Sequence, residues 1–349
     1  MQPVLMQPEC SVSDPAVHFA DEIRKLKINM DMDAKMMIRV LIIAVAVAVL
    51  MPAVTVLTGC AMPQNHNAAQ DGTGAGEETD GAKDDVGAKN GHDKGTTWKK
   101  NIALDPKWEW ADLSEINTGE AVLYTAASDR KDIVIGVNAG HGTTGGENVR
   151  TYCHPDKSPK ITNGTNPKGS LKAVAISTGM IFKDGTPEAE VTLKASRILR
   201  DKLLEKGYDV LMLRDDSDVR LDNVARTVIA NNIAGCHVSL HWDGDGLNYD
   251  KGCFYIPVPD EIKDMEPVMS HASAHESLGT ALIEGLRDNG CMIYEGTVYP
   301  QELTQTCYST IPSAVVELGN NASKHDDATL EKLADGLLAG IESFLDENR

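Results

Sequence analysis

DIVIGVNAGHG, residues 132–142, is the stretch that decides the fold, because an apolar run rich in β-branched residues ends in a histidine flanked by glycines. Runs of this kind predict strands that are buried within a sheet. Each of four further apolar runs also ends in polar or glycine-containing sequence: 208–213 (YDVLML), 236–241 (CHVSLH), 253–258 (CFYIPV) and 314–318 (AVVEL). Together the five runs predict the strands of one sheet.

Helical periodicity separates these runs and is clearest over 188–206, where the apolar residues share one face. Gly207 supplies the stop signal of this predicted helix. We expect Thr186 to be its N-cap and Pro187 to occupy its first position.

Two more helices are predicted, over 273–288 and 328–344. Strands that alternate with helices are typical of the α/β class. We therefore expect a single domain over 132–349, with a mixed, largely parallel sheet flanked by helices. Residues 98–131 would precede it as a short ordered extension.

Polar side chains suited to catalysis occur where predicted strands end. His141 follows the first strand, His241 ends the third and Glu317 lies near the end of the last, while Glu188 lies in the first turn of a helix. Open α/β sheets build their sites at the carboxyl ends of their strands. Two imidazoles and one carboxylate can hold a catalytic zinc ion with a fourth position open for water, and a second carboxylate can act as general base.

Each of these residues also has a structural interpretation. A histidine at a strand end is more often a hydrogen-bonded structural residue than a ligand. Glu188, like Glu190, could simply complement the positive end of the helix dipole, and Glu317 could be a buried ion-pair partner. Composition and spacing alone therefore indicate only a candidate metal-dependent hydrolase.

Five short motifs occur in a specific order along the chain: 138–142 (NAGHG), 187–193 (PEAEVTL), Arg214-Asp215 followed by Arg226 and Ala230-Asn231, 239–241 (SLH), and 316–320 (VELGN). In this order they resemble the zinc-dependent N-acetylmuramoyl-L-alanine amidase family, the amidase type 3 catalytic domain. The resemblance covers nearly all of residues 132–344.

The resemblance implies three zinc ligands and one catalytic carboxylate. Carried over residue by residue, the ligands are His141, Glu188 and His241, and the catalytic carboxylate is Glu317. The implied reaction cuts the amide between N-acetylmuramic acid and L-alanine of peptidoglycan stem peptides, by zinc-activated water with Glu317 as the base.

The chain also departs from the family pattern. The family has aspartate and proline before its GHG motif, where this chain has Asn138 and Ala139, and Asp243 stands where a small polar residue such as asparagine is common. Glu188 is preferred to Glu190 as the ligand because of its spacing from a helix leucine. These departures leave open a zinc hydrolase of another amide or peptide. They also leave open a peptidoglycan-binding lipoprotein without catalysis, although such a protein would need no general base.

An unusually long segment separates His141 from Glu188 and predicts a loop beside the site. We expect His154, within this segment, to be exposed to solvent, with an extra ligand or a blocking group as the alternative. His237 lies on the same strand as His241 at roughly 13 Å by strand rise, too far to share one metal, and is expected to be a core or interface residue.

A secretion signal is predicted over 36–60, where basic residues precede a long apolar run that ends in LTGC. The last four residues resemble the lipobox of bacterial lipoproteins, which implies lipidation of Cys60 and an extracytoplasmic protein anchored to the cell membrane. An uncleaved transmembrane helix is the alternative. Residues 1–35 would then be an upstream extension or the result of a mis-set start.

Residues 61–97 contain a single Val, Ile, Leu or Phe, which is Val86, and so cannot form a core. We interpret them as a flexible tether between the lipid and the domain.

The formal net charge of -19 argues against nucleic acid as a partner, because binding to phosphates depends on clustered basic residues. Besides Cys10 and Cys60, five cysteines remain, so at least one is unpaired in a monomer, which is the expected state. We expect Cys236 and Cys253 to be buried thiols within strands.

Overall fold

The computed structural model describes residues 98–348, and every structural statement concerns this part of the chain. The predicted upstream extension (1–35), the lipoprotein signal (36–60) with Cys60, and the tether (61–97) lie outside the described residues. Among the helices of residues 98–348, none combines the length and the apolar character needed to cross a membrane.

A sheet of seven strands forms the centre of the domain, in the order β1-β2-β6-β3-β7-β9-β8. The strands are β1 (Trp98–Ala103), β2 (Glu120–Thr125), β3 (Val134–Ala139), β6 (Asp209–Met212), β7 (Cys236–Asp243), β8 (Phe254–Tyr255) and β9 (Ser313–Asn320). The four central strands β6, β3, β7 and β9 pair in parallel, whereas β1, β2 and β8 add antiparallel pairs at the two edges. The prediction of a mixed sheet is confirmed, and its parallel pairs are confined to the centre.

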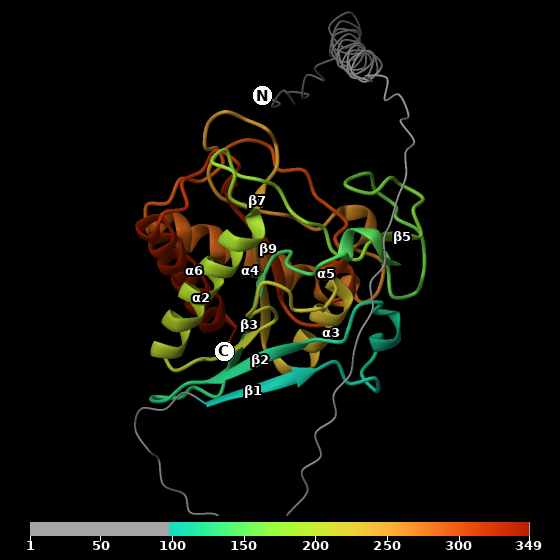
Figure 1. The fold of residues 1–349 in the computed structure, drawn as a ribbon, viewed down its shortest axis with the longest axis horizontal. Helices are drawn as coiled ribbons and strands as arrows, with labels where there is room; N and C mark the ends of the chain where they lie inside the picture. Colours follow the sequence, from blue (N-terminus) through green and yellow to red (C-terminus); the bar gives the residue numbers. More distant parts are fainter. Residues whose placement is uncertain (1–97, 349) are drawn as a thin grey trace, which may run out of the picture. The chain divides into compact units, whose positions relative to one another are not determined.

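Helices cover both faces of this sheet (Figure 1). The helices are α2 (Glu188–Glu205), α3 (Asn223–Ile233), α4 (Val268–Asp288), α5 (Thr304–Tyr308) and α6 (Asp327–Glu347), with short 3₁₀ turns η1 (Ala111–Leu113), η2 (Gly146–Asn148) and η3 (Asp260–Ile262). The helices α2, α4 and α6 pack together on one face, whereas α3 and α5 lie on the other. The predicted α/β class with flanking helices is confirmed.

Alternation along the central strands sends their side chains to these two faces. Ile135 and Val137 of β3 are fully buried in the core beneath α2, α4 and α6. The intervening positions face α3, and there the polar side chains of Asn138 and Ser239 are hydrogen-bonded to each other at 2.8 Å. The side of the sheet that carries α3 is therefore the polar side on which the site is built.

The first predicted helix is present, but its start differs from the prediction. Pro187, in an extended conformation, is the N-cap of α2, and no side chain caps the helix. Thr186 instead belongs to the preceding turn, because its carbonyl accepts a hydrogen bond from the backbone N–H of Phe182 at 2.9 Å. The end of the helix agrees with the prediction, since Gly207 follows it with a φ of 86°.

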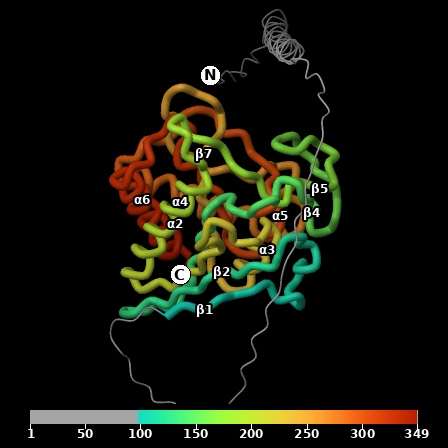
Figure 2. Tube along the Cα trace, viewed as in Figure 1, coloured from blue at the N-terminus to red at the C-terminus, as the bar shows by residue number. Residues whose placement is uncertain are grey.

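Two segments have more regular structure than the sequence indicated. Residues 98–131 contribute β1 and β2, which extend the main sheet beyond β6. The long segment between His141 and Glu188 contains β4 (Arg150–Tyr152) and β5 (Lys172–Val174), which pair as a separate antiparallel sheet. In Figure 2 this small sheet lies beside α5, and the hydroxyl of Tyr308 in α5 donates to the carbonyl of Tyr152 at 3.0 Å.

Candidate metal centre

His141 lies where β3 ends, and its backbone and ring are both fixed. The residue has a left-handed φ of 67°, which turns the chain sharply away from the strand. On the ring, Nδ1 lies 2.9 Å from the carbonyl oxygen and 3.0 Å from the hydroxyl oxygen of Ser177. A hydrogen bond at Nδ1 sets the tautomer and leaves Nε2 available as a ligand.

Three ligand atoms from three elements meet at one point. His141 Nε2 lies 2.8 Å from Glu188 Oε1, and His241 Nδ1 lies 3.1 Å from each of these two atoms. Four ligands at zinc–ligand bonds of 2.0–2.1 Å would be separated by about 3.3 Å in a tetrahedron. The observed spacing is slightly tighter than this value, and the donor set is one that zinc accepts, so the residues fit a zinc ion.

Glu188 is held in place by backbone as well as by the histidines. Its Oε2 accepts a hydrogen bond from the N–H of Met180 at 2.8 Å, and its Oε1 accepts one from Trp242 at 3.0 Å. Burial alone would raise the pKa of this carboxyl, but hydrogen bonds and charge from His141 and His241 lower the pKa overall. Glu188 is therefore a carboxylate, the form in which it can bind a cation.

Burial lowers the pKa of His241, while the hydrogen bond with Glu188 opposes that effect. A lowered pKa favours the neutral imidazole, which is the form that coordinates a metal.

Glu317 lies next to His241 on the adjacent parallel strand, where the two residues are partners in the β7–β9 register. Its Oε2 is sealed from solvent and has no hydrogen-bond partner within the described residues. Burial raises the pKa of Glu317, and the negative charges of Glu188 and Asp243 raise it further. A buried carboxyl oxygen without a partner beside a ligand is costly for the fold, which is typical of a functional group.

A cavity of about 250 Å³ opens over this cluster and is lined by His141, His241 and Glu317. Its opposite wall comes from the long segment that follows His141, including Lys160 and Ala173, and from residues around the start of α5, including Glu302 and Gln305. The predicted position of the long segment, beside the site, is therefore confirmed.

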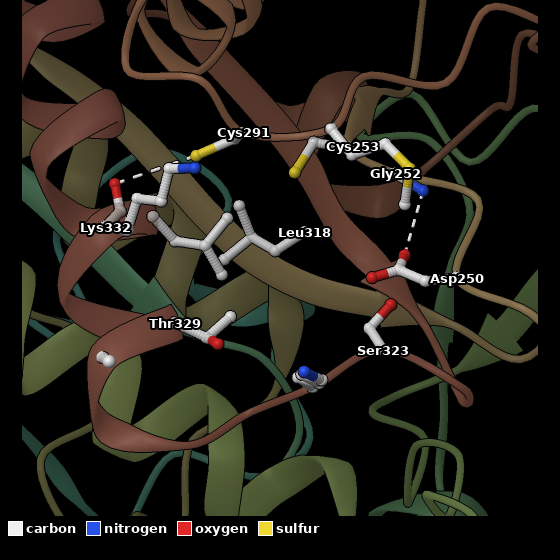
Figure 3. A pocket seen from close by; sticks show the side chains of 12 residues that line it. Asp250, Gly252, Cys253, Cys291, Leu318, Ser323, Thr329 and Lys332 are labelled. Atoms are coloured by element: carbon white, nitrogen blue, oxygen red, sulfur yellow. Dashed lines mark hydrogen bonds between the residues drawn. The ribbon is translucent and has the colours of Figure 1, made fainter.

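A second hollow of about 340 Å³ lies on the other face of β9 (Figure 3). Leu318 lines it together with Cys253, Cys291 and residues of α6, whereas Glu317 lines the cavity over the cluster. Adjacent residues of a strand point to opposite faces, so the two hollows are separated by the sheet. No residue of the His141, Glu188 and His241 cluster lines this second hollow.

The absence of a side chain at Gly140 leaves room for the imidazole of His241 beside His141. A Cβ atom at this position would lie 2.3 Å from Cε1 of His241, well inside van der Waals contact. We expect Gly140→Ala to displace the imidazole of His241 and to weaken metal binding at least as much as the about 10- to 100-fold loss caused by outer-shell changes. Metal content after dialysis measures this effect.

Gly235→Ala is the matched control, since its Cβ would make only an ordinary contact at 3.6 Å with the carbonyl oxygen of Val134. Metal content equal to that of the unmodified protein in both variants would show that the close approach is not needed.

Two buried arginines hold the turn that carries His141. Arg226 donates to the carbonyl oxygens of Ala139 at 3.1 Å and His141 at 2.7 Å, and Arg214 donates to those of Ala139 at 3.0 Å and Gly140 at 2.9 Å. Arg226 also donates to the Asn138 side chain at 3.1 Å. Both arginines belong to the sequence motif quoted above, but their role in positioning His141 is visible only in three dimensions.

We expect Arg226→Met to lower the free energy of unfolding by about 2–4 kcal/mol, because it removes the donor to the buried carbonyl of His141 and to the side-chain oxygen of Asn138. Chemical denaturation measures the change. Arg220, an exposed arginine that donates to the carbonyl of Thr144 at 3.0 Å, is the control, and Arg220→Met should stay within about 0.5 kcal/mol of the unmodified protein. Equal effects of the two substitutions would contradict the positioning role of Arg226.

Asn138 has a structural role of its own. Besides accepting from Arg226, it donates to Ser239, whose hydroxyl in turn donates to Gln305 of α5. Gln305 then donates to Ser313 of β9 at 2.7 Å. An amide suits this position because it both donates and accepts.

The expectation that His154 is exposed is wrong. The residue is 3% exposed, and its Nε2 lies 2.7 Å from Oε1 of Glu302. It does not belong to the candidate ligands, since the one His, Cys, Asp and Glu group within residues 98–348 with metal-binding geometry is His141, Glu188 and His241. A partner that lies so far along the chain could not be read from the local sequence.

The prediction of a core position for His237 is confirmed, because the residue is fully buried. Cys236 and Cys253 are buried free thiols, as expected, but only Cys236 belongs to a strand, since Cys253 directly precedes β8. Cys153, Cys291 and Cys307 are also free. Asp243, at the end of β7, is paired with Lys251 and lies outside the cluster of candidate ligands.

The α/β domain gathers two histidines that follow or end parallel strands and a carboxylate from the first turn of α2, a donor set that hydrolytic enzymes use to hold zinc. The model of the N-acetylmuramoyl-L-alanine amidase family, Amidase_3, matches residues 135–342, which is more than half of the chain. This chain therefore belongs to the N-acetylmuramoyl-L-alanine amidase family, and its predicted membership is confirmed.

A solved amidase structure shows the same fold, and a second gives a weaker alignment. The N-acetylmuramyl-L-alanine amidase of Mycobacterium smegmatis aligns with a TM-score of 0.51 and 19% identity, over 63% of this chain and 100% of that chain. The apo form of the amidase of Mycobacterium abscessus gives a TM-score of 0.49 at 19% identity, over 61% of this chain and 99% of that one. A comparison with curated proteins gives no significant match.

Proposed function

We propose that this protein hydrolyses the amide between N-acetylmuramic acid and L-alanine of peptidoglycan, with zinc held by His141, Glu188 and His241. One observation carries the proposal: three ligand atoms meet within 4.8 Å of one another, and Glu317, the residue in register with His241, has a buried carboxyl oxygen without a hydrogen-bond partner among the described residues. When bound, zinc would polarise the amide carbonyl and make water a stronger nucleophile near neutral pH.

Glu317 moves the proton in this mechanism. It accepts a proton from the attacking water and passes it to the amide nitrogen as the carbon–nitrogen bond breaks, which gives a carboxylic acid and a free amine. Its raised pKa, caused by burial and nearby negative charge, suits a group that must hold a proton between these two steps. The Ser177 contacts with Nδ1 of His141 keep that ring in the ligating orientation.

The proposed cellular context is that of a lipoprotein. We infer lipidation at Cys60, an extracytoplasmic location and a monomeric enzyme reaching the wall through the 61–97 segment. Radioactive palmitate supplied to cells should label the protein, and Cys60→Ala should abolish the label.

The activity is tested by digesting purified peptidoglycan with the zinc-loaded protein, beside a sample treated with a chelator. Free stem peptides that begin with L-alanine, identified by mass spectrometry and lost on chelation, are expected. A metal-dependent fragment of another kind would show that the enzyme cleaves a different bond. Bound zinc without any released fragment would favour a binding protein.

A further inference from the structure

Lys160 brings a buried positive charge to the wall of the catalytic cavity. The residue is 5% exposed, and it lines the same cavity as His141, His241 and Glu317. No other lysine or arginine lines that cavity. Lys160 shares this cavity with the carboxyl groups of Glu302 and Glu317, so its attraction for an anion is local to the ammonium group.

The ammonium group of Lys160 has donors to spare. Its Nζ donates to the backbone carbonyl of Glu302 at 3.1 Å, and within residues 98–348 no carboxylate lies in ion-pair contact with it. An ammonium has three hydrogens to donate. A buried charge that meets only one neutral acceptor is poorly compensated, so an anion that enters the cavity would gain from it.

The carboxylate of Glu302 is not that anion, because other donors occupy it. It accepts from the N–H of Ile161 at 3.0 Å and of Thr162 at 2.8 Å, from the hydroxyl of Thr162 at 2.7 Å, and it lies 2.7 Å from Nε2 of His154. Glu302 thus fixes the backbone that follows Lys160 without neutralising the lysine through an ion pair.

The position of Lys160 is fixed by its own backbone too. Its N–H donates to the carbonyl of Ser170 at 2.9 Å, and its carbonyl accepts from Gly169 at 2.8 Å. The lysine therefore stands on a paired stretch of chain, and little ordering entropy is lost when it binds a ligand.

We propose that Lys160 recognises a free carboxylate on the second residue of the stem peptide. The enzyme would then prefer stem peptides in which this carboxylate is free to those in which it is amidated. The inference rests on the proposed function, because it assumes that the amide next to this peptide lies at His141, His241 and Glu317. The carboxylate belongs to the leaving peptide, which occupies the same cavity as Lys160 during the reaction.

Two synthetic muramyl peptides test this preference, identical except that the second residue is D-glutamate in one and D-isoglutamine in the other. The full-length protein should cleave the acidic peptide with a kcat/KM about 10- to 100-fold higher, as a charge-assisted hydrogen bond predicts. Lys160→Met should bring the ratio of the two kcat/KM values close to one, by lowering kcat/KM for the acidic peptide alone. Lys160→Arg should retain part of it.

Lys168 supplies the control, since it is an exposed lysine of the same segment, and Lys168→Met should preserve the full ratio. Calorimetric titration of each peptide gives a second readout that needs no turnover, with the same ratio expected in Kd. The proposal is overturned if the unmodified protein gives equal kcat/KM and equal Kd values for the two peptides. It is also overturned if Lys160→Met lowers kcat/KM by the same factor for both. If neither peptide nor whole peptidoglycan is cleaved, the proposed function fails, and the ratio of the two Kd values still decides the role of Lys160.

Discussion

Glu317→Gln is expected to lower turnover by about 10²- to 10⁴-fold, the range for loss of a general acid–base group. Zinc content should not change, because Glu317 lies outside the cluster of the three ligands. Glutamine has nearly the same shape but cannot accept and release the proton. Release of stem peptides from peptidoglycan, measured together with metal content, checks both expectations.

Glu147→Gln makes the same chemical change at an exposed position and should leave turnover unaltered. Near-normal turnover of zinc-loaded Glu317→Gln would remove this residue from the mechanism. Loss of zinc from the same variant would instead make it a ligand.

Glu188→Gln is expected to abolish both metal binding and hydrolysis. The substitution removes the negative charge that His141 and His241 meet at Oε1, and an amide oxygen is a much weaker zinc ligand than a carboxylate. The loss of metal affinity should exceed the about 10- to 100-fold typical of outer-shell partners. Added zinc should raise the Tm of the unmodified protein and leave that of the variant unchanged, since a ligand stabilises only the state that binds it.

The exposed neighbour Glu190 in the same helical turn provides a sharp comparison. Glu190→Gln should keep zinc, the Tm increase and turnover. The reverse outcome, with the metal lost from Glu190→Gln and kept in Glu188→Gln, would exchange the roles of the two residues.

The strands that build the site could be predicted because burial on both faces leaves a strong local signal. Runs such as DIVIGVN are apolar enough to be identified alone, and polar residues at their ends then fall at one edge of a parallel sheet. His141, His241 and Glu317 were found in this way, and the structure brings the first two together with Glu188.

Elements with a weaker local signal were missed. The helix α3 was not predicted, because its sequence NVARTVIANNI mixes β-branched residues and asparagines of low helix propensity. Its signal was Asp222, an N-cap whose side chain accepts from the N–H of Ala225 at 2.8 Å. The strand β1 is mostly exposed, so it carries little apolar alternation to reveal it.

The environments of buried polar residues depend on partners that are distant in sequence. His154 and Lys160 both contact Glu302, and no local sequence pattern around either residue predicts that contact. Sequence patterns identify which residues are chemically able to act, whereas folding decides which of them face the same cavity.

The hydrogen bonds from the backbone of Ile161 and Thr162 to the Glu302 carboxylate have a consequence for how this enzyme could be altered. The floor of the cavity, with His141, His241 and Glu317, comes from the ends of the central strands, while much of its opposite wall comes from the segment between His141 and Glu188. A different wall could be transplanted onto this floor only if it kept the contacts of Ser177 with Nδ1 of His141 and of the Met180 N–H with Oε2 of Glu188. Any such graft must bring along a matching residue at position 302, because the carboxylate that fastens residues 161 and 162 of the wall is encoded outside it.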